Sequence, residues 1–174
     1  THEKLSYHIN NTPLGVVEFN MSLQIEQWSK RAAEIFGWSK EDLQEQKSLV
    51  ETLVYHDDIS MVEQAIHNIV DKKYDNGVLQ IRNNTKDGLV IYCEWYNSVL
   101  KDDKGNVTGV IAMVHDITHR KEIQTELEEA EAKFRNLVEQ SMVGVYIIQA
   151  GKFSYVNPRL CEITGYASEE MINK

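Results

Sequence analysis

Hydrophobic and polar residues alternate or cluster in short segments over the first 115 positions, which is typical of a mixed α+β domain. Two segments near the beginning and three before His115 have the length and composition of strands; these are 16–19, 23–28, 78–83, 90–100 and 107–115. Residues that favour tight turns separate the last three, at 86–88 and 101–106. The pattern therefore predicts five strands, with the last three joined by hairpins.

The segment between the second and third strands predicts helices instead. A short helix at 30–36 ends at Gly37, and Ser39 with Asp42 forms a partial capping pattern for another at 39–44. A longer helix begins at Asp57 or Asp58. Apolar residues then recur at steps of three and four positions, which gives this helix one apolar face: Ile59, Val62, Ala65, Ile66 and Ile69.

A different period begins after His115. Apolar residues follow in alternating steps of four and three, which is a heptad seam: Ile123, Leu127, Ala130, Phe134 and Leu137. A seam this narrow needs a partner surface, either the same helix of a second chain or the outer face of the sheet. We favour a parallel homodimer through this helix; the alternative is a monomer whose helix folds back on its own domain.

An internal repeat shows how the chain is divided. Residues 4–43 recur at 133–171, so that Gly15-Val16-Val17 matches Gly144-Val145-Tyr146. We therefore divide the chain into a domain at 1–116, a helical linker at 117–138 and the N-terminal fragment of a second domain at 139–174. The fragment has no central sheet to close its core, so we expect it to pack on another chain or to be poorly ordered.

Composition narrows the class of function. The net charge of −9, with scattered Lys and Arg, argues against nucleic acid as a partner. No apolar run approaches the ~20 residues of a membrane span, and the N-terminus does not resemble a secretory signal, so a cytoplasmic location is expected.

Cys93 and Cys161 match no disulfide or metal spacing. No nucleophile with its base and no Gly-rich phosphate loop appears, so we assign no catalytic residue and expect no enzyme activity in this chain.

Four short motifs, in this order, resemble the PAS family with its C-terminal PAC half. They are His56-Asp57-Asp58, Lys86-Asp87-Gly88, Asp103-Lys104-Gly105-Asn106-Val107, and Asp116-Ile117-Thr118 followed by Arg120-Lys121. The resemblance covers 4–122 and begins again at Lys133. It implies an α+β PAS fold: a five-stranded antiparallel sheet with short helices on one face, then a coiled-coil-like helix and a truncated second PAS unit.

The resemblance to the flavin-binding, light-sensing branch of the family also places candidate ligand-binding residues. Six residues of the last three strands would face a pocket: Asn83, Cys93, Trp95, Asn97, Ala112 and Val114. The two asparagines would orient a ligand. In the alternative interpretation Trp95 simply fills the core and both asparagines bond to the backbone.

No cofactor is assigned. Flavin is disfavoured, because no Asn-Cys-Arg string stands between Gly37 and His56 and because Val114 replaces a glutamine of that branch. Haem-binding relatives carry their iron ligand close to the position of His56, but this histidine also fits the ordinary turn of the family. His115 and His119 are four residues apart, yet the helix is expected to begin between them, so no metal site is assigned either.

Asp116, Ile117 and Thr118 join the last strand directly to the seam helix. We expect them to relay a shift of the sheet to the linker, with Asp116 or Thr118 capping the helix. The resemblance implies a sensory or relay module of a signalling protein, of the sensor histidine kinase or diguanylate cyclase type, with its output domain beyond Lys174. The alternatives are a dimerisation spacer that binds nothing and a haem or flavin redox sensor.

Overall fold

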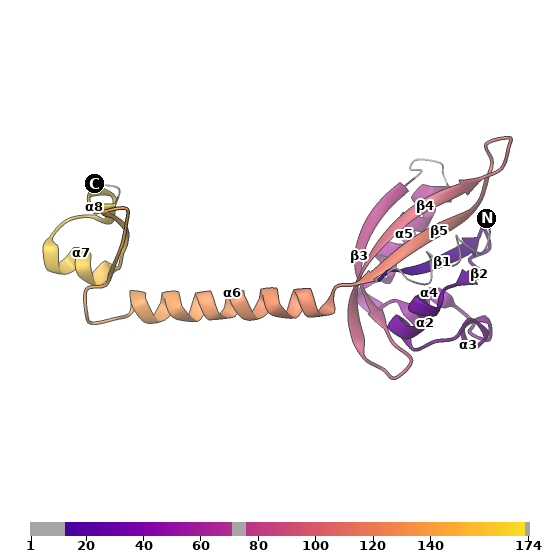
Figure 1. The fold of residues 1–174 in the computed structure, drawn as a ribbon, viewed down its shortest axis with the longest axis horizontal. Coiled ribbons are helices and arrows are strands. Elements are labelled where there is room, and N and C mark those ends of the chain that lie inside the picture. Colours follow the sequence, from indigo (N-terminus) through magenta and orange to yellow (C-terminus); the bar gives the residue numbers. More distant parts are fainter. Residues whose placement is uncertain (1–12, 71–75, 173–174) are drawn as a thin grey trace. The chain divides into compact units, whose positions relative to one another are not determined.

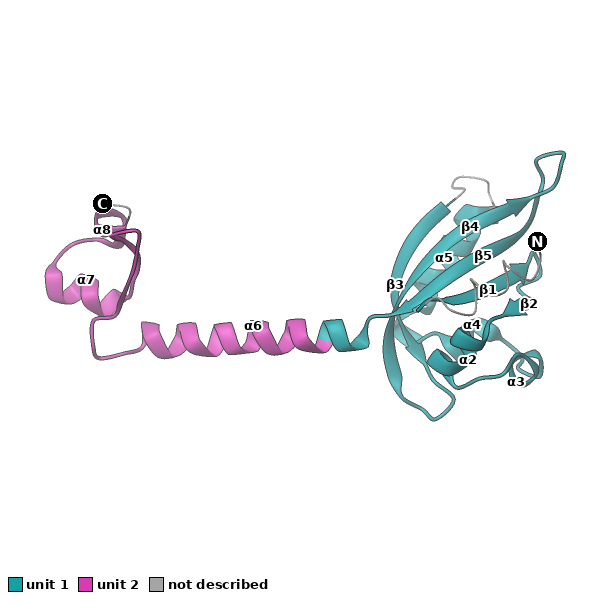
Figure 2. Ribbon diagram, viewed as in Figure 1, with its two compact units in different colours: residues 1–121 teal, residues 122–174 magenta. Residues whose placement is uncertain are grey.

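The structure is a computed structural model that describes residues 13–70 and 76–172. It contains two units, residues 1–121 and residues 122–174 (Figure 2). The predicted first repeat copy begins at Lys4, so its first residues lie outside the described part. Among the described residues, no helix combines the length and the hydrophobicity that a membrane span requires.

The first unit contains a sheet and a set of helices on one side of it (Figure 1). The elements are β1 Gly15–Asn20, β2 Ile25–Trp28, α2 Lys30–Phe36, α3 Lys40–Gln44, α4 Leu49–Leu53, the 3₁₀ helix η1 His56–Asp58, α5 Ile59–Val70, β3 Asn76–Asn84, β4 Val90–Lys101 and β5 Val107–Asp116. All neighbouring strands are antiparallel, in the order β2-β1-β5-β4-β3. The predicted α+β class with a five-stranded antiparallel sheet is confirmed.

Two local differences from the predicted elements have clear causes. The second strand begins at Ile25 rather than at Leu23, because Leu23 lies in the turn with a φ of 58°. The side chain of Asn20 closes this turn by accepting hydrogen bonds from the backbone N–H groups of Ser22 (2.9 Å) and Gln24 (3.0 Å). The helix α4 was not predicted; the Ser48 hydroxyl caps it by accepting from the Glu51 N–H at 3.2 Å.

The helix α2 shows why its sequence prediction was accurate at both ends. The Ser29 hydroxyl accepts hydrogen bonds from the N–H groups of Ala32 (3.2 Å) and of Val16 in β1 (2.8 Å), so it caps the helix and ties it to the sheet. At the other end Gly37 adopts a left-handed φ of 73° and donates to the Ala33 carbonyl at 2.8 Å. The caps therefore fix α2 against β1, the strand next to the edge strand β2.

The core lies between the helices and the inner face of the sheet. Its most deeply buried side chains come from strands and helices alike: Val17, Ala32, Phe36, Leu43, Cys93, Ala112 and Val114. The outer face is different, because Val78, Tyr96 and Met113 lie in register across β3, β4 and β5 and are each more than a third exposed. This outer face therefore carries an exposed apolar row within the described chain.

The linker helix α6 spans Thr118–Glu139, and β6 Tyr146–Gln149, β7 Lys152–Val156, α7 Pro158–Thr164 and α8 Ser168–Met171 follow it. The first repeat copy and this segment make the same contacts. Arg31 bonds the Pro13 carbonyl (3.2 Å) and Glu34 (3.2 Å), and Arg159 bonds the Met142 carbonyl (3.1 Å) and Glu162 (2.7 Å). The repeat read from the sequence is therefore a repeat of structure, and the second copy has the beginning of the same fold.

The predicted seam of α6 is exposed. Its large apolar side chains have exposed fractions of 52% to 65%: Ile123, Leu127, Phe134 and Leu137. None of the residues in α6 is buried. These four side chains therefore form an exposed apolar stripe along the helix.

Candidate functional site: an apolar cavity and the strand-to-helix junction

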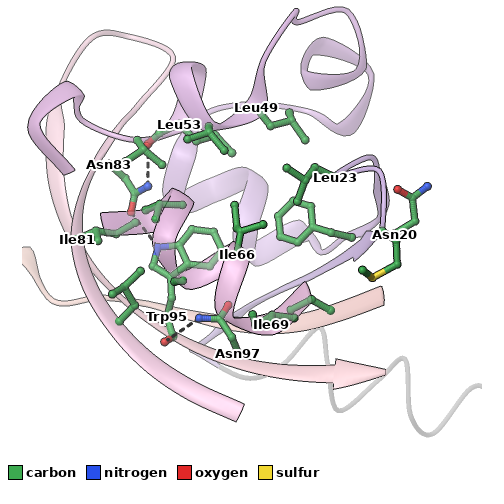
Figure 3. A pocket seen from close by; sticks show the side chains of 18 residues that line it. Asn20, Leu23, Leu49, Leu53, Ile66, Ile69, Ile81, Asn83, Trp95 and Asn97 are labelled. Carbon is green, nitrogen blue, oxygen red and sulfur yellow. Dashed lines mark hydrogen bonds between the residues drawn. The ribbon is translucent and has the colours of Figure 1, made fainter. Parts of the chain in front are cut away.

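A cavity of about 140 Å³ lies between α4, α5 and the inner face of the sheet (Figure 3). Four strands, the β1–β2 turn and two helices line it. The lining residues are Leu79, Ile81, Asn83, Trp95 and Asn97 from β3 and β4, Val110 from β5, Phe19, Asn20, Met21 and Leu23 from β1 and the turn after it, Leu49, Val50, Leu53 and Val54 from α4 and its end, and Val62, Ala65, Ile66 and Ile69 from α5. None of these side chains carries a charge. The cavity therefore favours an uncharged, mostly apolar occupant.

Three polar side chains are held in the wall of the cavity by a short chain of hydrogen bonds. Asn83 is fully buried; its Nδ2 donates to the Leu53 carbonyl at 2.7 Å, and its Oδ1 accepts from the Trp95 indole N–H at 2.9 Å. The Nδ2 of Asn97 lies 3.5 Å from the Trp95 carbonyl, which is a weak contact. Asn83 thus fixes the orientation of the indole, whereas the Asn97 amide makes only the weak contact to the Trp95 carbonyl among the residues drawn in Figure 3.

The six residues predicted to face the pocket separate into two groups. Asn83, Trp95 and Asn97 line the cavity, whereas Cys93, Ala112 and Val114 lie on the same face of the sheet within the packed core. The reason is the close approach of α2: a Cβ added to Gly15 would lie 2.7 Å from Val114 and 3.0 Å from the Ala32 backbone. This end of the sheet is filled by the helix, and the open space lies at the other end.

Cys93 is a core residue without the features of a reactive thiol. It is fully buried, and burial, with a smaller contribution from the charge of Asp116, raises the pKa of its thiol well above the usual range. At neutral pH the side chain is therefore a protonated thiol that packs like a small apolar group.

Of the 18 residues that line the cavity, sequence reasoning named only Asn83, Trp95 and Asn97 as pocket residues. It identified the apolar face of α5 without placing it at a cavity, and it did not identify the contributions of α4 and of the β1–β2 turn. The capping pattern of Ser48 and Glu51 was a signal for α4. No local signal shows that Leu49 and Leu23 meet across a cavity, because their proximity depends on the tertiary packing.

The size of the cavity limits its occupant. Pockets that hold drug-sized ligands and cofactors have volumes of ~300–1,000 Å³, so a cavity of about 140 Å³ is too small for flavin or haem. His56 is exposed on η1, with its Nε2 2.9 Å from an Asp57 carboxylate oxygen, and it is not among the lining residues. The described residues contain no group of three His, Cys, Asp or Glu side chains arranged to hold a metal ion.

The junction between β5 and α6 is fastened to the neighbouring strand β4. Asp116 Oδ1 accepts hydrogen bonds from both the N–H (2.9 Å) and the hydroxyl (2.6 Å) of Thr118, so Asp116 bonds the first N–H of the helix. The Thr118 hydroxyl oxygen in turn accepts from the Tyr92 N–H at 3.0 Å, and the Ile117 N–H donates to the Tyr92 carbonyl at 2.8 Å. Both backbone groups of Tyr92 are therefore bonded to the start of the helix.

The same strand, β4, carries the cavity residue Trp95. Trp95 pairs with Val114 in the β4–β5 ladder, and Cys93 pairs with Asp116. The indole in the cavity wall is thus three residues from Tyr92, along a strand that is hydrogen-bonded to β5 throughout this segment. A displacement of Trp95 has a short, continuous backbone route to the first turn of α6.

A second connection lies on the outer face of the sheet. The Glu94 carboxylate accepts a hydrogen bond from Gln80 at 2.6 Å and another from the Tyr96 hydroxyl, and it lies 3.8 Å from the Arg120 guanidinium of α6. The hydrogen bond from Tyr96, then that from Gln80, lowers the pKa of Glu94 below its usual value. Glu94 therefore stays ionised and adds a charge contact between β4 and the first turn of the helix.

Comparison with known proteins gives the same fold. A family model described as the PAS fold matches residues 25–114, just over half of the chain, and a model described as the PAS domain matches residues 132–174. A search of curated protein sequences returned no match. The two matched segments correspond to the two repeat copies.

Several solved structures share this fold. The PAS domain of a Colwellia psychrerythraea protein aligns with a TM-score of 0.59 and 19% identity, over 68% of this chain and 98% of that one. A sensory box histidine kinase/response regulator from Burkholderia thailandensis aligns with 0.58 and 17%, over 77% and 99%. The N-terminal domain of a diguanylate cyclase with a PAS/PAC sensor, from Marinobacter aquaeolei, aligns with 0.54 and 16%, over 62% and 98%. The family matches and this shared fold show that the chain belongs to the PAS family.

Proposed function

We propose that this chain is a sensory and relay module of a signalling protein. A small ligand in the cavity shifts Trp95 and β4, and the junction Asp116–Ile117–Thr118 passes the shift to α6. The observation that carries the proposal is the pair of hydrogen bonds between the backbone of Tyr92, on the same strand as Trp95, and Ile117 and Thr118 at the start of the helix. The module works by binding and displacement, and any catalysis belongs to an output domain.

The cavity defines the chemical class of the ligand. Its walls are apolar and uncharged, and a dry apolar cavity of comparable size, ~150 Å³, accommodates a molecule such as benzene. An anion would lose its hydration without gaining a charged partner, which is costly. We therefore propose an uncharged ligand with an apolar body of about the size of one aromatic ring, whose polar group, if it has one, meets Asn97.

The output and the assembly follow from α6. The exposed seam of Ile123, Leu127, Phe134 and Leu137 favours a parallel homodimer, in which the two α6 helices form a coiled coil that carries the signal. The similarity to the Burkholderia histidine kinase and the Marinobacter diguanylate cyclase supports an output domain of one of these two types. The free Cys93 and Cys161 fit a reducing cytoplasm.

Thermal unfolding with matched probes tests the ligand proposal. Benzene should raise the Tm of the full chain, whereas benzoate, which has the same ring and a negative charge, should leave it unchanged. The cavity-filling variant Ala65→Phe should lose the response to benzene, because Ala65 lines the cavity. Absence of a response to benzene and to other uncharged ring compounds would instead favour a dimerisation spacer that binds nothing.

A further inference from the structure

The side chain of Asn157, at the corner between β7 and α7, is fully buried and uses its whole hydrogen-bonding capacity. Its Oδ1 accepts from the N–H groups of Val145 (2.8 Å) and Leu160 (2.9 Å). Its Nδ2 donates to the carbonyls of Val138 (2.9 Å) and Val143 (3.0 Å). An amide has two acceptor and two donor positions of this kind, and all four are occupied.

The four bonds connect three separate segments. Val138 lies in the last turn of α6, where carbonyls have no partner within the helix. Val143 and Val145 belong to the segment that leads into β6, and Leu160 is in the first turn of α7. One side chain therefore joins the end of the linker helix to both elements that begin the second repeat copy.

Comparison with the first copy separates the two roles of this side chain. Ser29 is the equivalent residue, and its hydroxyl accepts from Val16 and Ala32, which correspond to Val145 and Leu160. A hydroxyl has a single proton, so it cannot donate to two carbonyls as the Asn157 amide does. The corner of the fold thus needs only an acceptor, and the two donated bonds are additional in the second copy.

We propose that Asn157 is a positioning residue that latches the end of α6 to the second PAS unit, so that the helix and the unit move together. These bonds keep the last turn of α6 attached to the second unit. A rotation or shift of α6 therefore also moves β6 and α7, whereas a frayed last turn would not transmit it. This role rests on the proposed relay function, whereas the latch itself is a property of residues 122–174 alone.

The variant Asn157→Ser tests the latch, because it restores the residue of the first copy. It keeps an acceptor for Val145 and Leu160 and removes both donors. Hydrogen exchange of the full chain should show the last-turn amides of α6, residues 136–139, exchanging about tenfold faster, the factor expected for a lost hydrogen bond. The first turn of α7 should keep its protection. Loss of protection throughout 142–172 would overturn the proposal, since Asn157 would then only hold the fold.

Pulsed EPR measures the width of the distance distribution between α6 and the second unit. This width would not change if Asn157 only stabilised the fold of the second unit. Spin labels at Glu131 in α6 and Glu169 in α8, with labelled chains diluted in unlabelled chains, report how firmly the helix is held to the second unit. We expect a narrow distance distribution that becomes at least twice as broad in Asn157→Ser. The control Asn136→Ser makes the same substitution on the exposed surface of α6 and should leave the width unchanged; equal widths in all three proteins would refute the latch.

Different results would refute the ligand-sensing proposal and the proposed latch at Asn157. The latch experiments use no ligand, so a chain that does not respond to benzene can still show a latch at Asn157. Conversely, a response to benzene together with unchanged exchange and distance in Asn157→Ser would leave the sensory function standing and remove the latch.

Discussion

Asn83 is the residue on which the geometry of the cavity most depends. It is fully buried, and it bridges the end of α4, through the Leu53 carbonyl, to the indole of Trp95. Without Asn83, a buried carbonyl and a buried indole N–H would both lack a partner, and each such group costs ~1–3 kcal/mol. The residue therefore contributes to stability and sets the position of the aromatic ring at the same time.

Replacement of Asn83 by Ala should lower the free energy of unfolding by about 2–4 kcal/mol, because it leaves two buried groups unpaired. Urea denaturation of the full chain measures this change. The neighbouring variant Asn84→Ala removes one partly buried hydrogen bond to the Val54 carbonyl and should cost only ~1 kcal/mol. Equal costs for the two variants would show that Asn83 has no special structural role.

Asp58 and Arg82 form a bidentate charge pair between η1 and β3. The Arg82 guanidinium bonds both carboxylate oxygens, at 2.7 and 3.1 Å, its backbone N–H bonds one of them at 2.7 Å, and its charged group lies over the Tyr55 ring at 4.4 Å. The side-chain hydrogen bond from Arg82 is the main cause that lowers the pKa of Asp58 below its usual value of 3.8. The pair ties η1 to β3.

This pair makes stability depend on pH in a defined direction. Because the folded-state pKa of Asp58 is lowered, its contribution is complete above the unfolded pKa of ~4 and is lost as the pH falls through the folded value. Asp58→Asn should therefore destabilise the protein by about 1–2 kcal/mol at pH 7. Urea midpoints between pH 7 and pH 3 should show the two proteins converging in acid; a constant difference would contradict the assignment.

At the scale of elements, the sequence predicted regular structure well and cavity walls poorly. The C-terminal limit of α2 was predicted correctly because Gly37 is a strong local signal, and in the structure the Ser29 cap fixes the other limit. The helix α4 was missed because five residues are too few for a visible period. The resemblance to the flavin-binding branch indicated which side chains of β3, β4 and β5 face inward, but it did not show that α2 fills one end of that face and leaves the other end open. That distinction depends on close packing at Gly15, which is a property of the folded chain.

The junction of β5 and α6 provides a test at the same scale. Thr118→Val keeps the shape of the side chain and removes the acceptor for the Tyr92 N–H and the donor to Asp116. We expect the amides of Tyr92 and of the first turn of α6 to exchange about tenfold faster, because a local hydrogen bond is lost while the sheet remains folded. Thr108→Val, in the β4–β5 hairpin, is the matched control and should leave α6 unchanged. Unaltered exchange at Tyr92 would show that the Thr118 hydroxyl does not hold the start of α6 to β4.

At the scale of the whole molecule, large apolar side chains are exposed in two regions. They include those of the α6 seam and, in the second unit, Met142, Ile148 and Tyr166, which are each more than half exposed. The described part of the second copy contains two strands and two short helices. The seam of α6 has the periodicity of a coiled-coil contact.

The homodimer proposal predicts that Leu127→Gln shifts the chain toward monomer. Leu127 is on the seam, and a polar side chain there lacks an apolar partner surface across a coiled coil. Light scattering after size-exclusion chromatography measures the mass. Glu128→Gln, one residue away and off the seam, should remain dimeric. A monomeric wild-type chain at the same concentration would rule out α6 as the dimer contact.

The central claim is that the cavity and the linker helix are coupled through β4 and the junction Asp116–Ile117–Thr118. The most direct test is a titration of the ¹⁵N-labelled chain with benzene, followed by backbone amide NMR shifts. We predict that the amides of Trp95, Val114, Ile117 and Thr118 shift along one common binding curve, while α3, which lies outside the cavity wall, stays constant. Shifts confined to the cavity walls, with the amides of Ile117 and Thr118 unmoved at saturation, would contradict the account.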